Sequence, residues 1–189
     1  MVGDRRRDGC KNVNRRTKRN PSTTQREEAP AEVQIRLARP EDATIVATVL
    51  HKSFVEFEPL YTRRGFAATT PDAAQVLARM REGPVWLAVR NAEVLGTVAA
   101  VLKGKSAYIR GMAVLPAARR LRVGARLLEH VEHWAFQEGC KRLFLSTTPF
   151  LDGAIRLYEK FGFRRAEGGT HDLFGTPLFT MEKDLHRMN

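Results

Sequence analysis

The 189-residue sequence has no long apolar run and only two cysteines, and each shortage excludes a broad class of protein. No apolar stretch approaches the roughly 20 residues that a membrane-spanning helix needs, so no membrane partner is expected. The N-terminus is rich in arginine without an apolar segment, which is not typical of a secretory signal, and we expect a cytoplasmic protein. Cys10 and Cys140 are too few for a disulfide framework and have no cysteine or histidine at metal-ligand spacing, so no metal site is expected.

Acidic residues are also scarce, because 21 Asp and Glu face 32 Lys and Arg, for a formal net charge of +11. Residues 1–20 alone carry eight Arg or Lys and two Asp. Residues 1–33 nearly lack large apolar side chains, so we expect them to form a basic disordered tail. Two interpretations of this tail stay open: an arm that binds nucleic acid or ribosomes through residues 1–20, and a solvated extension without a role.

From residue 34 to residue 189 the hydrophobic periodicity is that of one folded domain. Turn residues and alternating apolar residues predict six strands, at 34–38, 85–90, 94–102, 107–115, 142–147 and 178–185. Helix-start residues and helical spacing predict four helices, beginning at Pro40, Thr70, near Gly124 and at Ala154. Short turns favour antiparallel pairing in the first half, and a strand–helix–strand unit favours a parallel pair in the middle, so the fold class is α+β.

A candidate phosphate site lies where the strand ending at Pro116 leads through an arginine-rich loop into a helix. A helix N-terminus offers unpaired backbone N–H groups and a partial positive charge, which together bind phosphate oxygens. Gly124 allows close approach to the backbone, and the loop arginines add charge. On these residues alone, a diphosphate site and a solvated basic loop are equally good interpretations.

Three stretches in the right order carry a resemblance to a known family. They are IRLARPEDA near the start of the domain, VLPAARRLRVGARLLEHVEHWAFQEGCKRLFLST in its middle and AIRLYEKFGF near its end. Together they resemble the GCN5-related N-acetyltransferase (GNAT) superfamily over residues 34–185. The resemblance implies a mixed, mostly antiparallel sheet of about seven strands with about four helices, in three α/β/α layers. It also implies an enzyme that transfers the acetyl group of acetyl-CoA to a primary amine of a small molecule or protein.

The resemblance also implies which residues bind acetyl-CoA. Arg119 and Gly124 match the first and last positions of the family's Arg/Gln-x-x-Gly-x-Gly/Ala loop, whereas Arg120 and Arg122 stand where relatives commonly have glycine. An arginine fits there only if φ stays negative or if the strain is offset, although its guanidinium could meet a phosphate. The backbone beside the thioester is expected to come from the preceding strand, and Ser146 and Thr147 are expected to splay from that strand. The expected cofactor-binding residues are Met112, Ala113, Val114, Arg119, Arg120, Arg122, Val123, Gly124, Ala125 and Thr147.

Tyr158 occupies the family's tyrosine position and is our candidate general acid. A departing CoA thiolate has a pKa of about 8.5, and a phenol of pKa about 10 can protonate it. The alternative is that Tyr158 only packs on its helix face. No acid lies on the strand AYIRGMAVL, where relatives often carry a base, so Glu58, Tyr108, His171 and a water-mediated route are the candidates for the base, and we select Glu58.

Two other classes of function stay open. One is a non-catalytic acyl-CoA-binding module, because the altered loop could bind the cofactor without turnover. The other is a nucleic-acid-associated protein that acts through its tail, although the tail lacks aromatic residues for base stacking. The acceptor amine is not specified by the sequence, and both a monomer and a homodimer are compatible with it.

Overall fold

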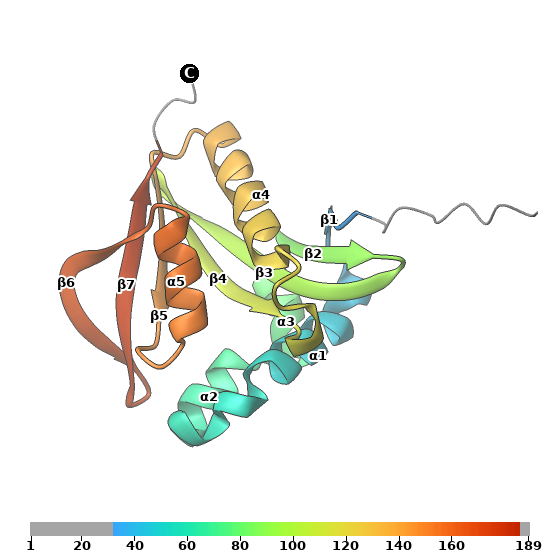
Figure 1. The fold of residues 1–189 in the computed structure, drawn as a ribbon, viewed down its shortest axis with the longest axis horizontal. Coiled ribbons are helices and arrows are strands. Elements are labelled where there is room, and N and C mark those ends of the chain that lie inside the picture. Colours follow the sequence, from blue (N-terminus) through green and yellow to red (C-terminus); the bar gives the residue numbers. More distant parts are fainter. Residues whose placement is uncertain (1–31, 186–189) are drawn as a thin grey trace, which may run out of the picture. The chain divides into compact units, whose positions relative to one another are not determined.

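The computed structural model describes residues 32–185, in which a seven-stranded sheet lies between helices (Figure 1). The strands are β1 (Gln34–Leu37), β2 (Val85–Arg90), β3 (Glu93–Lys103), β4 (Ser106–Val114), β5 (Arg142–Thr147), β6 (Arg164–Leu173) and β7 (Thr176–Asp184). The α-helices are α1 (Ala43–Phe54), α2 (Arg63–Thr69), α3 (Ala73–Met80), α4 (Val123–Gln137) and α5 (Asp152–Lys160). Short 3-10 helices are η1 (Pro40–Asp42), η2 (Val55–Leu60) and η3 (Pro116–Ala118).

The sheet has the strand order β1-β2-β3-β4-β5-β7-β6. Only β4 and β5 pair in parallel among these strands, and the other neighbours are antiparallel. The parallel pair is short, because its register runs from Ser106 opposite Arg142 to Ile109 opposite Leu145 and then stops. Both strands continue beyond this point, so the sheet splits between them at Ser146 and Thr147, where the resemblance implied it.

Two hydrophobic clusters cover the two faces of the sheet. One contains α4 and α5 side chains, with Leu127, Leu128 and Val131 fully buried against the sheet. The other contains α1 and α3 side chains, including Val49 and Val76. The predicted three-layer α+β arrangement with a mostly antiparallel mixed sheet is therefore confirmed.

A β-bulge in β4 shifts which face its side chains occupy. Thr97 pairs with Ala113 and Ala99 pairs with Arg110, so Gly111 and Met112 together oppose one residue of β3. Gly111 has a φ of 57°, a left-handed value that glycine adopts at low cost. Ile109 before the bulge and Met112 within it both pack with the α4–α5 cluster, whereas Ala113 after it packs with α1.

Two elements were missing from the predicted set. Helix α2 has only seven residues and lies within the stretch 56–69 that shows no clear period. Strand β6 pairs with β7 but is mostly exposed, so its residues lack the apolar alternation that marks a strand. The predicted tail, residues 1–33, lies outside the described residues except for its last two and stays a prediction. No helix within residues 32–185 is long and apolar enough to cross a membrane.

Candidate active site

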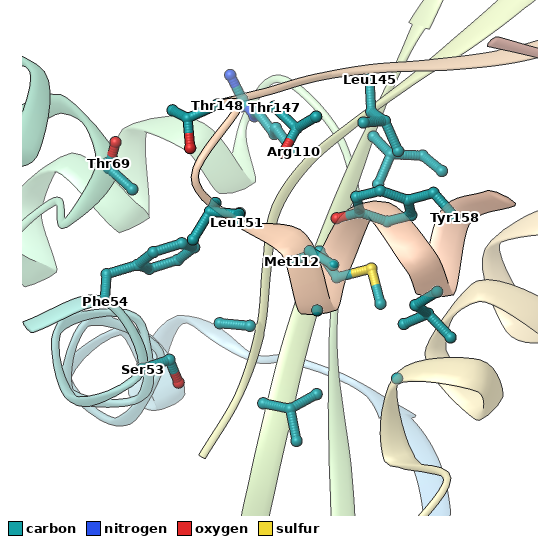
Figure 2. Close-up of a pocket in the computed structure, with 18 of the residues that line it drawn as sticks. Ser53, Phe54, Thr69, Arg110, Met112, Leu145, Thr147, Thr148, Leu151 and Tyr158 are labelled. Atoms are coloured by element: carbon teal, nitrogen blue, oxygen red, sulfur yellow. The ribbon is translucent and has the colours of Figure 1, made fainter. Parts of the chain in front are cut away.

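A cavity of about 1010 Å³ opens where β4 and β5 separate, and residues from both faces of the sheet line it (Figure 2). The α4–α5 face contributes Gly124, Leu157 and Tyr158, and the α1 face contributes Ser53 and Phe54. Tyr158 lines the cavity. All ten expected cofactor-binding residues also lie in its lining, namely Met112, Ala113, Val114, Arg119, Arg120, Arg122, Val123, Gly124, Ala125 and Thr147. The structure thus brings together residues that were selected from distant parts of the sequence, while their binding roles stay predictions.

The N-terminus of α4 forms one wall of this cavity. Its first intrahelical hydrogen bond joins the Arg126 amide to the Arg122 carbonyl at 3.0 Å. The amides of Val123, Gly124 and Ala125 therefore have no carbonyl one turn earlier in the helix, and no side chain of residue 122 caps them. Three adjacent N–H donors at the positive end of a 15-residue helix can bind phosphate oxygens.

The loop before α4 contains two arginines with left-handed backbone conformations. Arg120 has a φ of 71° and Arg122 a φ of 59°. The sequence left two options for them, a negative φ or strain, and the structure has the positive φ that normally favours glycine. Arg120 and Arg122 thus adopt a backbone conformation that glycine favours, at a cost of roughly 1–2 kcal/mol for each residue.

Positive charge surrounds this wall of the cavity. The exposed side chains of Arg119, Arg120 and Arg122 line it from the loop, and Arg156 and Lys160 line it from α5. Arg119 also forms an ion pair with Glu56 and donates to the Ser53 carbonyl at 3.3 Å, which ties the loop to the end of α1. Arg156 and Lys160 were not predicted as site residues, although their spacing of four residues in a predicted helix places them on one face.

The edge of β4 beyond the split faces the cavity. Arg110 to Val114 have β3 on one side, but the β4–β5 register ends at Ile109, so no strand of the described chain pairs with their other side. Gly111, Met112, Ala113 and Val114 all line the cavity. Backbone groups on this side are therefore available to hydrogen-bond an extended ligand or to polarise a carbonyl.

Tyr158 is buried, with 7% of its surface exposed, and its ring contacts Phe163 at 5.9 Å between centroids. Figure 2 shows its hydroxyl pointing from α5 into the cavity, near Met112. Burial raises the pKa of Tyr158 well above the usual value for tyrosine, so the phenol stays protonated. A protonated hydroxyl at this position can donate a proton but is a poor base.

The candidate bases are placed differently. Glu58 is exposed on η2 and is not among the residues that line the cavity, so the structure does not bring it together with Tyr158, and its selection as base stays a prediction. Tyr108 lines the cavity and packs on Phe144, with ring centroids 5.0 Å apart. His171 reaches the cavity indirectly, because its Nε2 lies 3.2 Å from Oγ of Ser146, which is a lining residue.

Comparisons with known proteins agree with this geometry. The family model described as "Acetyltransferase (GNAT) family" matches residues 47–163. The chain is 26% identical over 155 residues to the uncharacterized N-acetyltransferase YhfO of Bacillus subtilis (strain 168). This match covers 77% of this chain and 99% of that protein. It is 33% identical over 84 residues to the probable N-acetyltransferase camello of Xenopus laevis, covering 43% of this chain and only 38% of that relative's length.

A solved structure shares the fold. The PaiA N-acetyltransferase of Thermoplasma acidophilum in complex with coenzyme A superimposes with a TM-score of 0.67 at 18% identity. The match covers 81% of this chain and 99% of that one.

Proposed function

Because this chain belongs to the acetyltransferase (GNAT) family, we propose that it transfers the acetyl group of acetyl-CoA to a primary amine, on a small molecule or a protein. Family membership confirms the resemblance found in the sequence and the expected class of enzyme, an acyltransferase. The observation that carries the proposal is the set of three free amides at the start of α4, placed in one cavity with the open edge of β4.

The α4 wall suits the phosphates of acetyl-CoA. The amides of Val123, Gly124 and Ala125 would donate to the diphosphate, and the surrounding guanidinium and ammonium groups would add attraction at the rim. Acetyl-CoA supplies an activated acetyl thioester. The backbone of Met112, Ala113 and Val114 would hold the arm that carries it and polarise its carbonyl. Thr147, 5% exposed, lines the opposite strand and would contact the same arm.

Tyr158 would act as the general acid. Transfer forms a C–N bond, breaks the C–S bond and leaves a thiolate, which takes a proton from the Tyr158 hydroxyl while the attacking nitrogen loses one. Support for this role comes from the position of the Tyr158 hydroxyl, which points into the cavity and is protonated at neutral pH.

The attacking amine must be neutral, and the cavity itself favours that form. All seven charged residues in the lining are basic, and none of the lining residues, which all lie in the described part of the chain, is Asp or Glu. A positively charged surrounding lowers the pKa of a bound ammonium group, so a water-mediated route can remove its proton. Glu58 remains our candidate for the protein group that accepts it.

Two alternatives to this function have their own signatures. A non-catalytic acyl-CoA-binding module would bind CoA but release no thiol with any amine. A role in nucleic-acid binding would appear as salt-sensitive binding that disappears when residues 1–33 are deleted.

We further propose that the enzyme acts in the cytoplasm.

The test is turnover of acetyl-CoA by the full chain over a panel of amines, measured as free CoA thiol, together with CoA binding by calorimetry. Gly124→Glu should abolish CoA binding, because it adds a carboxylate at the helix N-terminus and because even a Cβ there would lie 2.8 Å from Cδ2 of Leu157. Gly168→Glu is the matched control, since nothing lies within 4 Å of a Cβ there and the residue is outside the cavity lining.

Tyr158→Phe should bind CoA normally and turn over at least about tenfold more slowly. Equal turnover by Tyr158→Phe and the unchanged protein would remove the acid assignment. Undetectable CoA binding by the unchanged protein would remove the proposed function as a whole.

A further inference from the structure

We infer that the acceptor amine also carries an anionic group, a carboxylate or phosphate, which Arg79 and Arg110 bind. This inference rests on the proposed function and names the substrate class of the same site. Both arginines line the cavity, yet neither belongs to the basic group at the start of α4.

Arg110 lies on β4 just past the split and on the face that α3 covers. It alternates with Ile109, which packs with α4 and α5, and its Nη2 donates to the Arg79 carbonyl in α3 at 3.1 Å. Arg79 in turn donates from Nη2 to the Ala68 carbonyl in α2 at 2.7 Å. Two positive groups are thus held on the side of the sheet opposite Gly124 and Tyr158, where the second substrate would lie.

The charge of this pair is only partly balanced. Within residues 32–185 the one carboxylate in ion-pair contact with either guanidinium is that of Glu82, 2.8 Å from Nη1 of Arg110. Glu82 is 52% exposed and outside the cavity lining, so water screens it. The carbonyls that hold the guanidiniums are neutral. Burial, and next the charge of Arg110, lower the pKa of Arg79. A bound anion would offset the repulsion between the two positive charges.

Unpaired buried polar atoms point to the same ligand chemistry. Three buried side-chain polar atoms have no hydrogen-bond partner within the described chain: Oγ of Ser53, Nε of Arg110 and Oγ1 of Thr148. All three residues line this cavity. A buried donor without a partner is unfavourable, so such atoms commonly mark a place for a ligand or water. The Nε–H of Arg110 can only donate a hydrogen bond, and the hydroxyl of Thr148 can also donate one. The oxygen atoms of an oxyanion would accept from both groups.

The acceptor class that fits is therefore a small amine with its own oxyanion and an apolar body. The apolar body would contact the aromatic and aliphatic lining of this side, provided by Phe54, Phe57, Tyr61, Leu173 and Leu178. Polycationic acceptors are disfavoured, because they would bring further positive charge into a lining that has no carboxylate.

Matched pairs of acceptors test the inference in acetyl-CoA turnover by the full chain. L-Phenylalanine is compared with L-phenylalaninamide, and phosphoethanolamine with ethanolamine, with spermidine as the polycation. We expect at least one anionic member to exceed its neutral partner in kcat/KM by about tenfold, the difference that one charge-assisted contact makes. The two anionic members also distinguish a carboxylate from a phosphate. Neutral members or spermidine turning over best would overturn the inference and leave the transferase intact, whereas no thiol release with any amine would overturn both.

Variants separate recognition from structural support. Arg110→Gln should raise KM for the preferred anionic acceptor about tenfold without changing KM for its neutral partner. Glu82→Gln, which frees the guanidinium of Arg110, should lower KM for the anionic acceptor. Arg81→Gln is the control, because Arg81 is exposed at the C-terminal end of α3, the helix that contains Arg79, and lies outside the cavity lining. Equal effects of Arg110→Gln on both acceptors, or a raised KM in Glu82→Gln, would show a structural role and overturn the inference.

Discussion

The left-handed conformation of Arg122 makes a quantitative prediction about stability. Its φ of 59° and ψ of 12° are unfavourable for any residue with a Cβ, by roughly 1–2 kcal/mol. Glycine removes this strain, but its greater conformational entropy in the unfolded chain lowers the free energy of unfolding by about 0.4–1 kcal/mol. Comparing Arg122→Gly with Arg122→Ala removes the guanidinium in both variants, so their difference isolates the backbone. We expect Arg122→Gly to be more stable than Arg122→Ala by about 1 kcal/mol, or roughly 2–4 °C in Tm.

A second pair of variants serves as the control. Arg81 ends α3 with a φ of −77° and a ψ of −18°, which is right-handed, so Arg81→Gly should be less stable than Arg81→Ala. In thermal unfolding we therefore expect the glycine variant to have the higher Tm at residue 122 and the alanine variant to have the higher Tm at residue 81. If glycine is the less stable choice at both, the strain argument for residue 122 is wrong. CoA calorimetry on the same proteins adds a separate result: a loss of affinity common to both Arg122 variants measures the guanidinium, since both lack it.

Two further predictions concern buried hydroxyls. If Tyr158 is the general acid, kcat should reach a plateau and should not fall as pH rises through 10, because burial raises the pKa of this phenol and the active form is the protonated one. A pH–rate profile that declines with an apparent pKa at or below 10 would contradict this. Thr148→Val should raise the free energy of unfolding of the ligand-free protein by about 1 kcal/mol, since it removes a buried hydroxyl that lacks a partner. Thermal unfolding measures this change, and a Tm for Thr148→Val below that of the unchanged protein would contradict the reasoning.

Periodicity was sufficient for the buried part of the fold. Strands β2 and β5 have the predicted bounds, because their side chains alternate or are buried on both faces. The same reasoning located α4, whose apolar stripe ends near Gly139. It failed for β6, which is mostly exposed and therefore lacks the apolar alternation of a strand that packs on a core. It also failed for α2, which is too short to show a helical period.

The proposed cofactor side of the site was more accessible to sequence reasoning than the proposed acceptor side. The residues Arg119–Ala125 are consecutive and form a local motif, so the resemblance could identify them from the sequence. Arg79 and Arg110 are 31 residues apart, and their contact depends on α3 packing across β4. No local pattern marks such a pair. The bulge at Gly111 was also hidden, because the inserted residue becomes evident only in the pairing with β3.

The gap between β4 and β5 has a kinetic consequence. Since residues from both faces of the sheet line one continuous cavity, a thioester held by α4 and an amine held beside α3 can approach from opposite sides. In the proposed reaction neither molecule would have to pass the other, so the architecture would impose no obligatory order of binding.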